Sequence, residues 1–125
     1  MNQRQTLLTG AIAGFLAVAV GAFGAHALKP ILIQSGKADV YELAVKYQFY
    51  HALALLLVGC LMQHDDGLWL RRSAIGFAGG IFLFSGSLYL LAFVSASVYG
   101  VITPLGGLFL LFGWGSLVVS FFKKK

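Results

Sequence analysis

Residues 73–122 read SAIGFAGGIFLFSGSLYLLAFVSASVYGVITPLGGLFLLFGWGSLVVSFF, and this stretch, the longest without a charged residue, decides the fold of the chain. A helical span needs about 20 apolar residues to cross roughly 30 Å of hydrocarbon. The 50 uncharged residues are therefore enough for two spans joined by a short turn. The small and polar residues at 95–100 (SASVYG) interrupt the Leu and Phe runs and predict that turn.

Two shorter uncharged stretches precede this one, 24 residues at 5–28 and 18 residues at 47–64, and each can hold one span. Of the 125 residues, 59% are hydrophobic and 10% are charged, whereas soluble domains carry about 25% charged residues. Runs such as Leu108–Phe112 are apolar at successive positions, which excludes the period-two pattern of a membrane β-barrel. We therefore expect an all-α integral membrane four-helix bundle, a single domain over 1–125, with spans at approximately 6–28, 47–63, 73–94 and 99–122.

The first loop predicts a short amphipathic helix at 37–46. Its sequence, KADVYELAVK, places Val40, Leu43 and Ala44 on one helical face and charged residues on the other. Such a segment is expected to lie at the membrane surface and to run into the second span. Lys29–Pro30 should end the first span, because the residue before a proline avoids helical backbone angles.

The basic residues predict the orientation of the bundle. With four spans, both termini and the middle loop share one side of the membrane, and that side carries six Lys and Arg residues against three on the other. The six are Arg4, Arg71, Arg72, Lys123, Lys124 and Lys125; the three are Lys29, Lys37 and Lys46. The positive-inside rule then places both termini in the cytoplasm. Because these residues lie at span ends and not on one clustered face, their expected partner is the lipid bilayer, with the lysine tail meeting anionic headgroups, and not a nucleic acid.

Small residues recur along one side of the first span at alternating steps of four and three. They are Gly10, Gly14, Ala17, Gly21 and Gly24. Such a stripe lets the backbone of a neighbouring helix approach closely, so we predict that it is a helix-packing face. A pore or a helix hinge is the alternative interpretation.

Polar residues of the spans collect in the outer half of the predicted bundle. All four acidic residues fall in predicted loops, so no carboxylate lies at mid-membrane, where proton-coupled carriers usually place an ionisable group. His26 precedes Lys29 by three residues and His51 follows Lys46 by five, which puts both histidines within about 5 to 8 Å of the predicted outer boundary. The second span adds Tyr47 and Gln48 to this polar layer, and the third and fourth spans add Ser85, Ser87, Tyr89, Tyr99 and Thr103.

The polar layer has two interpretations. In the structural one, its side chains bond to their own helices and to their neighbours. In the functional one, His26 and His51 form a site for haem, a metal ion or another ligand, because imidazole is the commonest metal ligand. The layer offers no third strong ligand and does not identify a cofactor. Enzyme motifs are absent from the sequence: the serines at 84–87 (FSGS) lie inside a span, unlike those of a nucleophile elbow, and no phosphate-binding loop occurs.

Four motifs, one in each span, resemble those of a known family. They are GAFGAHAL at 21–28, YQFYHALA at 47–54, FSGSLY at 84–89, and ITPLGG at 102–107 continuing to GW at 113–114. They are similar to the family called domain of unknown function 423, which includes small bacterial inner-membrane proteins and is related to the eukaryotic transmembrane protein 256. The resemblance covers almost the whole chain. It implies a four-span inner-membrane protein without an established catalytic activity, and for some bacterial members an association with membrane integrity. Its motifs fall on the polar layer at His26, Gln48, Tyr50, His51, Ser85, Tyr89 and Thr103.

Three functions are compatible with these observations. The first is a non-enzymatic, compact membrane protein, alone or as a homo-oligomer, that supports membrane integrity or a partner membrane complex. The second is a protein that binds haem, a metal ion or a lipid-like molecule such as a quinone through His26 and His51. The third is a small channel or carrier, which requires a water-filled path along the glycine seams.

Overall fold

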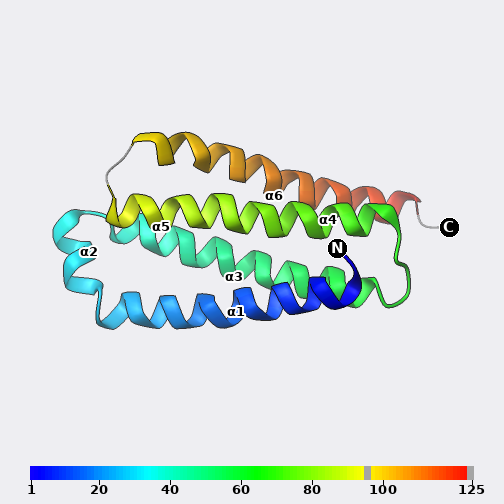
Figure 1. Cartoon of the computed structure of the whole chain (residues 1–125), viewed down its shortest axis with the longest axis horizontal. Helices are drawn as coiled ribbons and strands as arrows, with labels where there is room; N and C mark the ends of the chain where they lie inside the picture. Colours follow the sequence, from blue (N-terminus) through cyan, green and yellow to red (C-terminus); the bar gives the residue numbers. More distant parts are fainter. Residues whose placement is uncertain (95–96, 124–125) are drawn as a thin grey trace.

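Long apolar helices lie side by side along the long axis of the molecule and form one bundle (Figure 1). The computed structural model describes residues 1–94 and 97–123. The spans are α1 (Gln3–His26), α3 (Ala38–Leu61), a third span built from α4 (Leu68–Gly80), η1 (Ile81–Ser85) and α5 (Gly86–Phe93), and α6 (Ser97–Lys123); the short helix α2 (Lys29–Ser35) joins α1 to α3. The described residues contain four segments long and apolar enough to cross a membrane, and no strand. The predicted all-α membrane bundle is confirmed.

The first span begins with a capping box, a reciprocal pair of side-chain hydrogen bonds to backbone N–H groups at the start of the helix. The Asn2 side chain accepts a hydrogen bond from the Gln5 backbone N–H at 2.9 Å, and the Gln5 side chain accepts one from the Asn2 backbone N–H at 3.0 Å. The first turn of a helix has no carbonyl partners for its N–H groups, so this exchange fixes where α1 starts.

The first loop differs from the prediction. Pro30 lies in the first turn of α2, where its missing N–H costs nothing. Gly36 ends α2 in the left-handed region at φ 71°, which glycine adopts without strain. The segment at 37–46 is not a separate surface helix: from Ala38 onward it forms the first turns of α3, because no proline and no glycine before Gly59 interrupts the helical stretch.

The third span contains one turn of π-helix, η1, between α4 and α5. A π turn inserts an extra residue into the helical register and often lies at a functional position. Here it lies near the middle of the span, where the backbone of Phe84 approaches Gly106 of α6 and the Ser85 hydroxyl reaches α3. The sequence pattern gave no indication of this turn.

The last span starts earlier than predicted. Residues 97–100, which the sequence assigned to a turn, already belong to α6. The other two residues of that predicted turn, Ser95 and Ala96, lie outside the described residues, as do Lys124 and Lys125 of the lysine tail.

The first span, α1, packs mainly against the second, α3, and the third span packs mainly against the fourth, α6. Helix α3 lies between α1 and the third span (Figure 1). One core surrounds Leu55, Val58 and Phe77, and a smaller one surrounds Tyr41 near the α2 end. Large apolar side chains such as Phe82, which is 78% exposed, cover the outside. In a bilayer this outer surface faces lipid tails, so the core can be small and the fold depends on close helix contacts and interhelical hydrogen bonds.

Candidate functional site

Gln48 joins three helices in the middle of the bundle. Its side chain is only 7% exposed. The amide Nε2 donates to the Ala13 carbonyl of α1 at 2.9 Å, and Oε1 accepts a hydrogen bond from the Tyr89 hydroxyl of α5 at 2.7 Å. The small side chains of Ala13 and Ala17, both buried, let α3 come close enough to α1 for this bond. Because no water can replace these bonds in hydrocarbon, the amide ties α1 and α5 to α3.

His51 lies one turn further along α3 and is bonded through both ring nitrogens. Nδ1 lies 2.7 Å from the Tyr47 carbonyl oxygen, and Nε2 accepts a hydrogen bond from Trp114 Nε1 of α6 at 3.1 Å. A carbonyl only accepts and an indole N–H only donates, so this arrangement requires a neutral ring with its proton on Nδ1. The Nε2 lone pair, which a metal ion would need, is already used by Trp114.

Hydroxyl groups make further bonds between helices. Three pairs join the third span to its neighbours: Ser85 Oγ donates to the Ala44 carbonyl of α3 at 2.8 Å, Ser73 Oγ donates to the Gly113 carbonyl of α6 at 2.8 Å, and the Ser87 and Thr103 hydroxyls lie 2.6 Å apart. Polar side chains of α3, the third span and α6 are therefore partners of one another or of a neighbouring backbone. The buried Ser116 hydroxyl of α6 is the exception, because it has no hydrogen-bond partner among the described residues.

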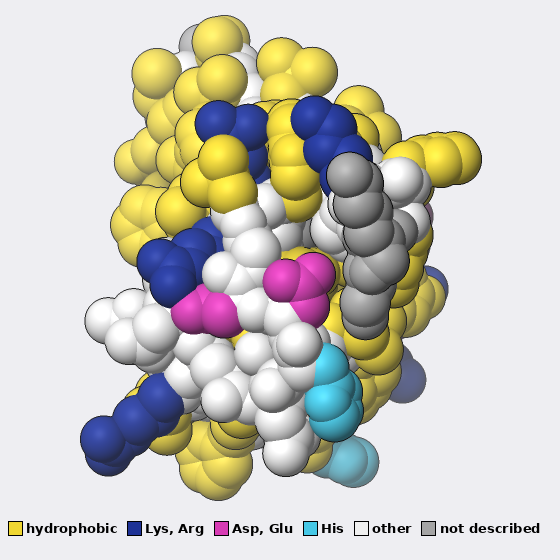
Figure 2. All heavy atoms as spheres, turned by 90° about the vertical axis from the view of Figure 1, so that its right-hand side faces the viewer, with side chains coloured by type: hydrophobic (Ala, Val, Ile, Leu, Met, Phe, Trp, Pro, Cys, Tyr) yellow, Lys and Arg dark blue, Asp and Glu magenta, His cyan; other side chains and the backbone are white. Residues whose placement is uncertain are grey.

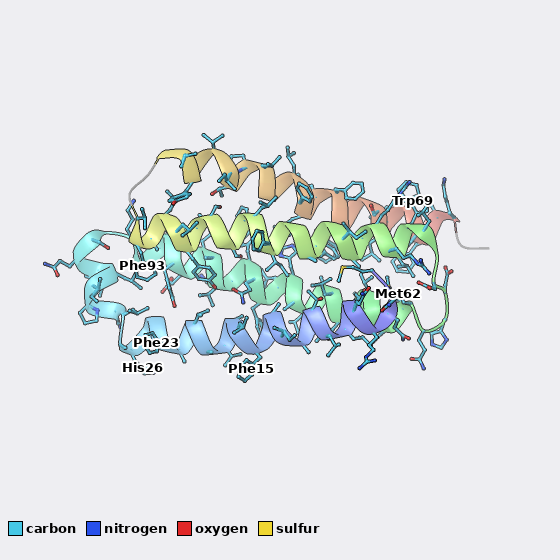
Figure 3. The ribbon with its side chains drawn as sticks, in the orientation of Figure 1. Phe15, Phe23, His26, Met62, Trp69 and Phe93 are labelled. Atoms are coloured by element: carbon cyan, nitrogen blue, oxygen red, sulfur yellow. The ribbon has the colours of Figure 1, made fainter. Side chains whose placement is uncertain are left out.

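The structure contradicts the predicted pairing of His26 with His51. His26 is the last residue of α1, is exposed, and lies on the outside of the bundle (Figure 3). The region of α3 around Gln48 and His51 lies opposite Ala13 of α1. The 13 residues from Ala13 to His26 correspond to about 20 Å along a helix axis. The two rings cannot share a ligand, so the alternative interpretation in which His26 and His51 together hold haem or a metal ion is wrong.

The error arises from the position of the membrane boundary. The prediction placed that boundary at Lys46, but α3 begins at Ala38 and Lys46 lies eight residues further on, about 12 Å along the axis. His51 and Gln48 are consequently near the middle of the 24-residue helix and not at its outer end. Lysine tolerates such a position because its long side chain lets the ammonium group reach the membrane surface.

Tyr50 does not belong to the polar cluster either. It is 55% exposed on the outside of α3, although the family motif includes it. Ser85, Tyr89 and Thr103 lie in the half of the bundle toward α2. Across residues 1–94 and 97–123, no group of three His, Cys, Asp or Glu side chains is placed to hold a metal ion.

Sequence reasoning missed two polar partners. Trp114 was absent from the predicted polar layer. Tryptophan is usually enriched at the membrane interface, so its position inside a predicted span could have indicated a hydrogen-bond partner for its N–H group. Tyr41 was assigned to a surface helix, but it is 4% exposed and donates a hydrogen bond to the Val20 carbonyl of α1. Gly24 makes room for its ring, since an added Cβ there would lie 2.1 Å from a ring carbon.

The small-residue stripe of α1 faces α3 along most of its length. An added Cβ at Gly10 would lie 3.0 Å from the Ala52 carbonyl oxygen, and one at Gly21 would lie 3.2 Å from a Val45 methyl group. Ala17 is buried in the same contact. Gly14 has more space, because an added Cβ would be 3.8 Å from the nearest atom. The stripe is thus closely packed at Gly10, Gly21 and Gly24 and more open at Gly14.

Helix backbones approach each other most closely between the third span and α6. An added Cβ at Gly106 would lie 2.3 Å from the Phe84 backbone nitrogen, and one at Gly76 would lie 2.7 Å from the Gly113 nitrogen. At Gly106 and Gly76 the backbone of the facing helix fills the space that a side chain would take. There is therefore no room between the third span and α6 at these glycines for the water-filled path that a channel requires.

Charged side chains gather at the end of the bundle that carries both termini, between hydrophobic flanks (Figure 2). Arg71 Nε donates to Asp66 Oδ1 at 3.0 Å, and this hydrogen bond lowers the pKa of the exposed Asp66 carboxyl group. The Arg72 guanidinium and the Lys123 ammonium lie 4.6 and 5.2 Å from the centre of the Trp69 ring. A tryptophan flanked by cations is typical of a membrane interface.

Comparisons with known proteins agree on one family. The family described as Protein of unknown function (DUF423) matches residues 20–107. The chain is 37% identical to the UPF0382 inner membrane protein YgdD of Escherichia coli K12 over 100% of this chain and 95% of that protein. It is 43% identical to a UPF0382 membrane protein of Haemophilus influenzae, covering 99% and 97%, and 42% identical to the UPF0382 membrane protein YwdK of Bacillus subtilis, covering 94% and 95%. No solved structure matches the chain.

Proposed function

The chain belongs to the family described as Protein of unknown function (DUF423), and from this membership we propose that it is a non-enzymatic protein of the bacterial inner membrane that supports membrane integrity or a membrane complex. It is a small multi-pass membrane protein. Its role would be mechanical: a compact bundle that keeps its shape in the bilayer and offers its outer surface to lipids, a second copy or another membrane protein.

One observation carries this proposal. Gln48 uses its amide on Ala13 and Tyr89 of other helices, and His51 uses one ring nitrogen on Trp114 of α6 and the other on the Tyr47 carbonyl of its own helix. A catalytic or ligand-binding group needs a free donor, acceptor or lone pair aimed at its substrate. Side chains already bonded to each other favour the structural interpretation of the polar layer over the ligand-binding one.

Deletion of the gene followed by complementation tests the role. We expect deleted cells to admit more of a membrane-impermeant DNA dye after osmotic downshift, and a plasmid copy of the wild type to restore exclusion. His26→Ala should complement fully, because its ring is exposed at the end of α1. The integrity role is wrong if deleted and parent cells admit equal dye and no stoichiometric protein partner copurifies with the tagged chain.

Elemental analysis and an absorption spectrum of the gently purified protein separate this role from the cofactor alternative. The proposal predicts less than a tenth of an equivalent of any transition metal and no haem or quinone absorption. One equivalent of metal or haem that is lost in His51→Ala would instead identify a cofactor protein.

We further propose that both termini lie in the cytoplasm. The basic residues at the end of the bundle with the termini support this orientation through the positive-inside rule (Figure 2). His64, in the α3–α4 connection, and Ser35, at the end of α2, are exposed at opposite ends of the bundle.

Cysteine labelling in intact cells checks the orientation. In a background with Cys60→Ala, Ser35→Cys should react with an impermeant maleimide and His64→Cys should react only after the membrane is opened. Both variants should label equally after solubilisation in detergent, which controls for intrinsic reactivity. Labelling of His64→Cys and protection of Ser35→Cys in sealed cells would reverse the orientation.

A further inference from the structure

A continuous groove follows the outer side of the seam between α1 and α3. Three overlapping depressions with volumes of about 560, 320 and 580 Å³ make it up. The first and second share Val18 and Phe49, and the second and third share Gly21, Val45 and Lys46. The groove therefore extends from the level of Gly10 to that of Lys29, and the 14 residues from Gly10 to Gly24 alone correspond to about 21 Å.

The groove exists because glycines lie beside large side chains. At Gly14 an added Cβ would still be 3.8 Å from the nearest atom, so the open space there is wider than at Gly10 or Gly24. Phe15, 75% exposed, points away from the bundle and borders this part of the groove (Figure 3). The lining of this first depression is apolar, and the groove as a whole is longer than the roughly 15 Å of one bilayer leaflet.

The other end of the groove carries charge. Lys46 lines both the second and third depressions, and Lys29 and Glu42 line the third. In the part of the chain that the structure describes, the ion pair is Arg71 with Asp66, so neither lysine has a carboxylate partner there. With one carboxylate and two ammonium groups in its lining, this end of the groove has a net positive charge.

From this geometry we propose that the groove binds one anionic phospholipid, with an acyl chain between α1 and α3 and the phosphate held by Lys29 and Lys46. The apolar part matches the chain, and the positive end matches the headgroup in sign and depth, since a lysine inside a span extends its ammonium toward the interface. A second copy of the protein fits less well, because a two-fold contact over this groove would bring two Lys46 side chains together. This site goes beyond the structural role, which does not require a bound lipid.

Native mass spectrometry of the full chain in mild detergent tests the site. The protein is incubated with equal amounts of phosphatidylglycerol and phosphatidylcholine, and the lipid retained is identified by mass. We expect one retained phosphatidylglycerol. Lys46→Gln and Lys29→Gln should each weaken its retention about fivefold, because each removes one cation near an anionic lipid. Lys37→Gln removes the same charge at the same end of the bundle but outside the groove lining, and should leave retention unchanged.

A second variant blocks the groove without changing its charge. Gly14→Leu projects a side chain into the apolar part and should reduce retention of both lipids while the spectrum still shows folded monomer. If Gly14→Leu does not fold, the lysine variants still test the site, because Lys29 and Lys46 are exposed and their substitution should leave the fold intact. Equal retention of the two lipids, equal effects of Lys46→Gln and Lys37→Gln, or a dimer that cross-links through position 18 would overturn the proposal.

Discussion

Gly106→Ala should remove most of the folded protein. The added Cβ would lie 2.3 Å from the Phe84 nitrogen and 2.6 Å from its Cα, so the obstruction is backbone and not the end of a flexible side chain. Relief requires α6 to move away from η1, which would also separate Ser87 from Thr103. Overpacking a core side chain costs about 1 to 3 kcal/mol, and a clash with backbone in the middle of two spans should cost at least that much.

Gly115→Ala provides the matched control, because it makes the same change in the same helix at a position with no atom within 4 Å. Size-exclusion chromatography in mild detergent and a thermal melt of the recovered peak give the measurement. Gly106→Ala should yield mostly aggregate or a strongly lowered melting temperature, whereas Gly115→Ala should match the wild type. Equal behaviour of the two variants would mean that α6 and η1 do not pack as described.

The second large effect is expected at His51. His51→Ala removes a buried ring beside Phe77 and leaves the Trp114 N–H without its acceptor. Cavity formation together with an unpaired donor should lower the free energy of unfolding by about 2 to 4 kcal/mol. His26→Ala, at an exposed helix end, should change it by less than about 0.5 kcal/mol. Titration with SDS in mixed micelles measures both.

Double variants separate the two histidines further. His26→Ala and His51→Ala share no partner, so their effects should add within about 0.5 kcal/mol. His51→Ala and Trp114→Phe remove the same hydrogen bond, so their combined effect should be smaller than the sum. Additivity at His51 and Trp114, or strong coupling between His26 and His51, would contradict the contacts described here.

The fold was predictable because it depends on where charge is absent. The uncharged stretches are long enough to span the membrane, and an unpaired backbone group in lipid is costly, so these stretches are expected to form helices. Helix ends were less accessible. The amphipathic stretch at 37–46 was interpreted as a surface helix, but α3 runs through it from Ala38 without a break, and lysine can extend to the interface from inside a span.

The candidate site was only partly predictable for the same reason. An error of eight residues at the start of α3 moved His51 from the outer boundary to mid-span and separated it from His26. Gln48 and Tyr89 were both identified, yet their hydrogen bond depends on the rotation of α3 and α5 about their axes, which a hydrophobic stretch does not encode. The π turn next to Ser85 also changes the helical phase within the third span. The charge pattern indicates which stretches span the membrane, whereas the depth of a residue depends on where its helix begins and its partners depend on packing.

Hydrogen bonds of Gln48, His51 and the hydroxyl groups of the third span to neighbouring helices hold the bundle together. ¹⁵N NMR of histidine-labelled protein in lipid bilayers at neutral pH tests this claim most directly at His51. The hydrogen bonds to Tyr47 and Trp114 predict a protonated Nδ1 and an unprotonated Nε2 whose signal shifts in Trp114→Phe. A doubly protonated ring, a proton on Nε2, or a signal insensitive to Trp114→Phe would contradict the claim.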